Sequence, residues 1–262
     1  MTLTDIVSSL GASQLSASAG QSERSRAPAA ADAVSRALDQ ASQRVEAQRS
    51  STEVRLSAFG QVRSAVAQLQ DSSRALTATE NTDTPEETRA AAEAFVSAFN
   101  NAQGTANRTV NGTPGTEEGN TDGALSGDGR ANIAASELSR TLNNASSEAL
   151  RNIGINRSQD GTLNIDRQRF EQALQNDPQA VGNALADVGR QVEQSSRRQL
   201  EGNSNLNQAV ANLSRQASEL EAQQQTQQAL ADNLQQATEQ AATRFNFVAA
   251  SGIRTYEQIF AL

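Results

Sequence analysis

The sequence contains no Cys, His or Trp, and it contains no Lys either, because all 22 of its basic residues are Arg. Enzymes take most of their proton carriers, thiol nucleophiles and Schiff-base amines from these missing residue types. The absence of Cys also excludes disulfides and thiolate metal sites. We therefore expect a structural or assembly protein, not an enzyme, and we expect it to use no metal and no cofactor.

Bulky apolar side chains are also scarce. Only 36% of the 262 residues are hydrophobic and 3% are aromatic, and the mean hydropathy is −0.59. These fractions provide too few bulky apolar side chains for a thick globular core, so they favour thin helix-on-helix packing. No apolar run approaches the roughly 20 residues that a membrane helix needs, so no membrane insertion is predicted.

The charge distribution argues against nucleic acid as a partner. The formal net charge is −8, the isoelectric point is about 4.8, and the Arg residues are dispersed, whereas phosphate binding needs clustered cations. The first basic residue is Arg24, and no long apolar stretch precedes it. We expect no secretory signal peptide, which places the protein in the cytoplasm unless it is exported without a cleavable signal.

Two long amphipathic helices are predicted, over residues 33–77 and 205–248. Apolar residues recur in both at steps of three and four, as in a coiled coil, although Gln224 and Gln227 interrupt the second seam. The fold expected is mainly α: a long antiparallel coiled-coil or helical bundle over residues 33–250, with short helices and one small β-hairpin. The seam residues, which we expect to pair within the chain and to contact partner chains, are Val34, Leu38, Val45, Leu56, Phe59, Val66, Leu69, Leu206, Val210, Leu213, Leu220, Leu234 and Phe245.

The two ends of the chain are predicted to be separate segments, 1–32 and 251–262. From Ser13 to Asp32 the only large apolar side chain is Leu15, so this stretch cannot bury enough surface to offset its ordering entropy. The first segment is therefore expected to be flexible.

Between the long helices the pattern predicts shorter elements. Thr84 and Pro85 predict a helix start, with the Thr hydroxyl as cap, and that helix should end near Asn100. Residues 101–124 predict a loop, and residues 131–150 another helix, with Ile133 among its apolar positions.

A hairpin and two further helices follow. Residues 153–155 and 162–165 are short β-prone pieces joined by a turn at 158–161. Asp166 and Asp177 are each predicted to cap a helix, and the chain should break near Gly202.

Four segments, taken together and in order, carry a resemblance to a known family. They are Leu56-Ser57-Ala58-Phe59-Gly60 with Leu69; Phe95-Val96-Ser97-Ala98-Phe99-Asn100; Gly123-Ala124-Leu125-Ser126-Gly127-Asp128 with Leu138 and Leu142; and Ile153-Gly154-Ile155, Asp160 to Asp166, Phe170, Ala173-Leu174, Asp177-Pro178 and Val181. This succession resembles the flagellar filament-capping family, FliD-type or hook-associated protein 2. The resemblance covers about residues 34–250.

The resemblance implies an oligomeric cap at the distal end of a growing flagellum. Its partners would be further copies of itself, flagellin or hook-filament junction proteins, and an export chaperone. Family members pass unfolded through the flagellar type III channel, so the expected location is extracellular, on the bacterial flagellum, without a cleaved signal peptide.

The sequence departs from the family pattern in three places. Family members insert large outer domains after the first long helix, but here only residues 77–85 join it to the Phe95 segment. The N-terminal Gly-Leu-Asp signature is not evident, and residues 245–262 match poorly. The chain thus resembles a short form of the cap that lacks the outer variable domains.

Each end carries a small apolar stripe. Ile6 and Leu10 lie on the first, and Ile253, Tyr256 and Ile259 on the second. Either stripe could form a helix that docks at the flagellar tip and orders on assembly. Frayed ends, or packing of the two stripes on each other, is the alternative.

The sequence argues against a calcium site and against catalytic carboxylates, and it leaves one alternative function open. Asp160 to Asp166 lacks the acidic spacing and the closing Glu of a calcium loop. The paired carboxylates have no apolar surroundings that would raise a pKa for acid–base catalysis. An intracellular coiled-coil scaffold, or an export chaperone that binds a client protein, is the alternative function.

Overall fold

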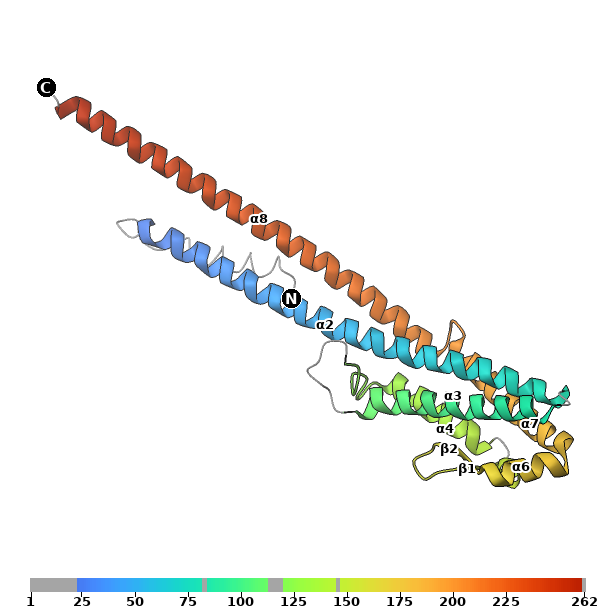
Figure 1. The fold of residues 1–262 in the computed structure, drawn as a ribbon. Coiled ribbons are helices and arrows are strands. Elements are labelled where there is room, and N and C mark those ends of the chain that lie inside the picture. The colour runs from blue at the N-terminus through green and yellow to red at the C-terminus, as the bar shows by residue number, and fades with distance from the viewer. Residues whose placement is uncertain (1–22, 82–83, 113–119, 145–146, 261–262) are drawn as a thin grey trace. The chain divides into compact units, whose positions relative to one another are not determined.

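The computed structural model describes residues 23–81, 84–112, 120–144 and 147–260 (Figure 1). Its helices are α2 (Glu23–Ala78), the 3-10 turn η1 (Thr79–Asn81), α3 (Pro85–Asn111), α4 (Gly129–Asn144), α5 (Ser147–Asn152), α6 (Arg167–Asn176), α7 (Pro178–Leu200) and α8 (Asn205–Phe260). The strands are β1 (Ile155–Arg157) and β2 (Leu163–Ile165). Two compact units result: unit 2 is Ala47–Ala222, and unit 1 contains the residues before and after it. The expected mainly α fold is confirmed.

In unit 1, the first part of α2 lies antiparallel to the last part of α8. Glu46 Oε2 accepts a hydrogen bond of 3.0 Å from Gln224 Nε2, and farther from this point Leu38 and Leu234 line the same groove. The residue numbers therefore run in opposite directions along the pair, as the sequence predicts. Leu38 and Val45 are buried between the helices.

Both long helices extend beyond the predicted bounds. α2 begins at Glu23 instead of near residue 33, and α8 continues to Phe260 instead of ending near residue 248. The stretch from Glu23 to Asp32 is rich in Ala, the strongest helix former, and needs no buried partner to favour helical backbone. Residues 23–32 are helical, residues 1–22 lie outside the described part, and the flexibility of the N-terminal segment stays a prediction.

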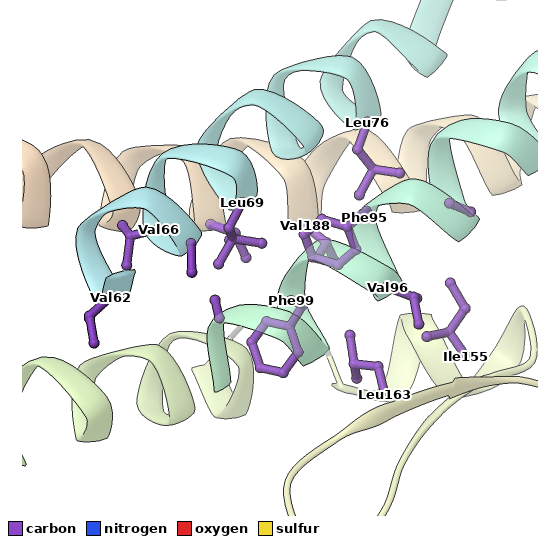
Figure 2. Close-up of a cluster of buried hydrophobic side chains, with 14 of the residues drawn as sticks. Val62, Val66, Leu69, Leu76, Phe95, Val96, Phe99, Ile155, Leu163 and Val188 are labelled. Atoms are coloured by element: carbon purple, nitrogen blue, oxygen red, sulfur yellow. The ribbon is translucent and has the colours of Figure 1, made fainter. Parts of the chain in front are cut away.

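Unit 2 has a continuous apolar core. Figure 2 shows side chains from α2, α3, α7 and the hairpin converging around Leu69, Phe95 and Phe99. These three side chains are at most 1% exposed. The core is thin but closed, because each helix contributes one apolar stripe and β2 packs on α3 near Asn100.

The third helix is longer than its sequence indicates. α3 runs through Gly104 to Asn111, so the loop predicted for residues 101–124 is wrong over residues 101–111. Ala102, Ala106 and Val110 are buried along this extension. Tertiary burial of one face outweighs the poor helix propensity of its Asn, Thr and Gly residues.

The helix starts are mostly as predicted. Asp166 Oδ1 accepts a hydrogen bond from the Arg169 backbone N–H at 3.1 Å, and Asp177 Oδ1 accepts one from the Ala180 N–H at 2.9 Å. Both caps are confirmed. Thr84 is different: its side chain makes no cap hydrogen bond to the backbone, because its hydroxyl donates to Glu87 Oε2 at 2.6 Å instead.

The predicted hairpin is confirmed, and helices are found in the segment before it. β1 and β2 pair antiparallel, with Ile155 opposite Ile165 and Arg157 opposite Leu163. Where one helix over 131–150 was predicted, α4 covers residues 129–144 and α5 covers residues 147–152, and residues 145–146 lie outside the described part. Ile133 on α4 is 45% exposed, since no described element covers that face. The chain breaks between α7 and α8 around Gly202, as predicted.

Candidate functional site

The described residues offer surfaces for binding, and no metal centre is found among them. Within the described ranges, no three His, Cys, Asp or Glu side chains come together as metal ligands. Over the same ranges no helix has both the length and the apolar character that crossing a bilayer requires. The candidate binding sites of the described part are surfaces and pockets of the two units.

Most of the predicted seam residues of unit 2 are used inside the unit. Phe59, Val66, Leu69 and Leu206 are at most 1% exposed. Three further seam residues, Leu56, Val210 and Leu213, are buried or half-buried against the same core. Leu220 is also buried, at 5% exposed. Their internal pairing leaves little of them available to a second chain.

Unit 1 has an open apolar groove, which we call the unit 1 groove. It has a volume of about 490 Å³ and is lined by Val34, Ser35, Leu38, Asp39, Ala231, Leu234, Gln235 and Thr238. Val34 is 44% exposed, and Leu230 on α8 is 38% exposed. Two helices alone cannot enclose an apolar stripe on every side, so Val34 remains open to solvent instead of closing the predicted seam.

The remaining predicted contact residues cannot be placed. Ile6 and Leu10 lie outside the described residues. Phe245, Ile253, Tyr256 and Ile259 lie on α8, but their side chains are outside the described part. Docking by either terminal stripe stays a prediction.

The junction between α2 and α3 is tightly packed on α7. Thr79 Oγ1 donates to the Leu76 carbonyl at 2.7 Å and to the Gly182 carbonyl at 3.2 Å. A β-carbon at Gly182 would lie 2.7 Å from the Thr79 carbonyl oxygen, so only Gly allows this approach. The junction at which the resemblance expects inserted domains is here a short turn held against a helix.

Ion pairs join the helices of unit 2 at the surface. Arg89 on α3 donates to both carboxylate oxygens of Glu171 on α6, and Nη2 to Oε2 measures 2.8 Å. The hydrogen bond to Glu171 raises the pKa of Arg89. Arg190 pairs with Glu80 and Asp187, and its hydrogen bonds to these carboxylates raise its pKa in the same way. The guanidinium groups of Arg89 and Arg190 therefore keep their positive charges.

Sequence reasoning missed a polar pocket at the end of α7. The apolar positions of α7 continue at helical spacing from Val188 and Val192 to Ser195, Ser196 and Gln199, all of which are buried. Polar residues at core positions were the signal that could have revealed it. We call this site, lined among others by Gln199, the α4–α7 pocket.

Comparison with known proteins gives one family. The family model described as flagellar hook-associated protein 2 C-terminus matches residues 46–250, more than three quarters of the chain and all of unit 2. A search of curated proteins found no match.

Proposed function

The chain belongs to the flagellar hook-associated protein 2 family, and from this membership we propose that it is a filament cap or cap-like axial structural protein. It would oligomerise at the tip of the filament or hook and support the assembly of flagellin. The single observation that carries the proposal is the family match over residues 46–250. The family is one of structural cap proteins and not of enzymes.

Unit 2 supports this function as a rigid base. Its core is closed around fully buried Phe residues, and Thr79 and Gly182 hold the α2–α3 junction against α7. A short, packed junction leaves no outer plate at this point of the chain. We propose that capping rests on the helical part of the molecule.

Unit 1 supports it as the part that meets other subunits. The unit 1 groove exposes Val34 beside Leu38 and Leu234, and its occupant in our proposal is a helix of a second copy of this chain. In the oligomer that we propose, a modest contact of this kind would be repeated by symmetry between identical subunits. The terminal stripes with Ile6 and Tyr256 are proposed to dock on flagellin or on hook-filament junction proteins.

A gene deletion tests the function directly. A strain without this protein should secrete flagellin that does not polymerise, and the protein of the parent strain should appear in sheared flagellar fractions. Normal filaments in the deletion strain would overturn the capping role. A protein found only in the cytosol with a bound client would favour an intracellular scaffold or export chaperone instead.

Subunit contact through the unit 1 groove has its own test. Val34→Asp places a carboxylate in the groove, and Gln40→Asp places the same charge at an exposed position outside the groove lining. The first variant should lower the oligomer mass measured by light scattering after size exclusion, and the second should not. Equal oligomer masses for both variants would contradict use of the groove.

A further inference from the structure

The α4–α7 pocket lies in unit 2, where α4, the end of α7 and the start of α8 meet. It has a volume of about 320 Å³. Its lining residues, mostly polar, are Ala134, Glu137, Arg140, Ser195, Arg198, Gln199, Asn203, Ser204, Asn205 and Leu206. The pocket is therefore suited to a polar ligand and not to an apolar side chain.

Hydrogen bonds within the α7–α8 turn fix the wall that this turn forms in the pocket. Asn207 Nδ2 donates to the carbonyl oxygens of Leu200 and Glu201 at 2.6 and 2.8 Å. The Ser204 hydroxyl oxygen accepts a hydrogen bond from the Asn207 backbone N–H at 3.2 Å. These bonds close the end of α7 and begin α8, so the pocket has a defined shape before any ligand enters.

Gln199 is the unusual residue of this pocket. It is 4% exposed, and neither its Oε1 nor its Nε2 has a hydrogen-bond partner within the described part of the chain. The neighbouring Ser196 hydroxyl, which is fully buried, also lacks a partner there. Buried polar groups are costly when they are unpaired, and nearly all of them have partners in native proteins. The described residues around Gln199 therefore supply neither a donor nor an acceptor for its carboxamide.

Another carboxamide of this chain, that of Asn100, pairs with the backbone of a strand residue. Asn100 Nδ2 donates to the Leu163 carbonyl at 2.8 Å, and Asn100 Oδ1 accepts from the Leu163 N–H at 2.7 Å. One side-chain amide thus pairs both polar groups of one residue in an extended strand. Gln199 has the same donor and acceptor pair on a side chain one methylene longer.

The charges around the pocket favour an anion. Arg140 and Arg198 contribute two positive charges and Glu137 one negative charge, in a chain whose net charge is −8. Asn205 and Leu206, in the first turn of α8, also line the pocket. The positive end of the α8 dipole is therefore directed at the ligand space.

We propose that the α4–α7 pocket binds an extended acidic peptide segment of a partner protein. The carboxamide of Gln199 turns into the pocket and pairs with one backbone N–H and C=O of the segment, as Asn100 does with Leu163. Arg140 and Arg198 hold a carboxylate side chain of the same segment. This site goes beyond the proposed capping function, and its test on purified protein is independent of whether filaments form.

The test is a binding titration of the full chain with two capped pentapeptides. The acidic probe is acetyl-Ala-Glu-Ala-Glu-Ala-amide, and the neutral probe is acetyl-Ala-Gln-Ala-Gln-Ala-amide. The acidic probe should shift the NMR signals of the Gln199 side-chain amide in a saturable way, and added salt should weaken its binding. The neutral probe should bind at least about tenfold more weakly, a difference of one decade in Kd.

Three variants separate the contributions. Gln199→Leu and Arg198→Gln should each raise the Kd of the acidic probe at least about tenfold, whereas Arg215→Gln, an exposed Arg on α8 outside the pocket, should leave it within about twofold. Gln199→Leu removes an unpaired buried amide, so its thermal stability should match or exceed that of the parent. Arg198 is exposed, which keeps the test valid if the Leu variant does not fold.

Other outcomes overturn the proposal. Equal binding of the two peptides would show that the carboxylates of the segment are not recognised. Equal loss in Arg198→Gln and Arg215→Gln would show attraction by the overall charge of the surface and not by the pocket. Acetate binding as tightly as the acidic peptide would leave no role for the peptide backbone. Unchanged binding in Gln199→Leu would mean that water alone satisfies the amide of Gln199.

Discussion

Gly189 on α7 faces the backbone of Ser73 on α2 so closely that a β-carbon at position 189 would lie 2.7 Å from the Ser73 carbonyl oxygen. The same β-carbon would lie 2.9 Å from the Thr77 backbone nitrogen. Real β-carbons do not approach other atoms at such distances, so the two helices would have to separate. The contact of α7 with the end of α2 therefore depends on the absence of a side chain.

The first prediction concerns this contact. Gly189→Ala should lower the free energy of unfolding by about 1–3 kcal/mol, because overpacking outweighs the better helix propensity of Ala. Denaturant unfolding followed by circular dichroism measures this change. Gly60→Ala is the matched control, since a β-carbon there meets nothing within 4 Å, and it should stabilise by about 0.5–1 kcal/mol. Equal effects of both substitutions would disprove the close approach.

The second prediction concerns the attachment of the hairpin to α3. Asn100→Ala removes both hydrogen bonds to Leu163, which is 5% exposed, and leaves backbone groups of β2 without partners. The free energy of unfolding should fall by about 1–3 kcal/mol, and the amide hydrogens of β1 and β2 should exchange faster. Asn101→Ala, at an exposed neighbouring position, should change the free energy of unfolding by no more than about 0.5 kcal/mol. It should leave the exchange of the strand amide hydrogens unchanged.

The third prediction concerns the pH dependence of the hairpin turn. Hydrogen bonds from the side chain and backbone of Thr162 lower the pKa of Asp160. A carboxyl group whose pKa is lowered by folding stabilises the protein above its unfolded pKa, and this contribution is lost as the pH falls through the folded pKa. In Thr162→Val the pKa of Asp160, followed by carboxyl NMR, should rise toward its ordinary value. No change on this substitution would show that the Thr162 hydroxyl does not hold the carboxylate.

The fourth prediction concerns the pair Arg89 and Glu171. Both side chains are more than a third exposed, so solvent screens their attraction. A double-mutant cycle of Arg89→Gln and Glu171→Gln should give a small favourable coupling at low salt that disappears near 1 M salt, where the screening length is about 3 Å. A coupling that persists at high salt would mean that the pair is shielded from solvent.

Local chemistry made part of this fold predictable from sequence. Asp166 and Asp177 were identified as caps because a cap bonds to an N–H only three residues ahead, so its signal is local. The hairpin was predicted for the same reason, from a polar turn between two β-prone pieces. The family could be recognised because several such local features follow one another in a set order.

Contacts between distant residues decided the rest. α3 continues through Gly104 because one face of residues 102–110 is buried by other elements, which no local pattern reveals. Periodicity marked Val34 as a seam residue but could not show that the groove beside it is open.

The sequence by itself determined that the chain is helical, that it lacks the side chains of most catalysis, and where the hairpin turn and the helices capped by Asp166 and Asp177 lie. Only the tertiary structure decided that Gly189 is a packing site and that the buried side chain of Gln199 has no hydrogen-bond partner among the described residues. Propensity and capping act within a few residues, whereas burial depends on which distant helix covers a given face, and that is settled only when the helices pack.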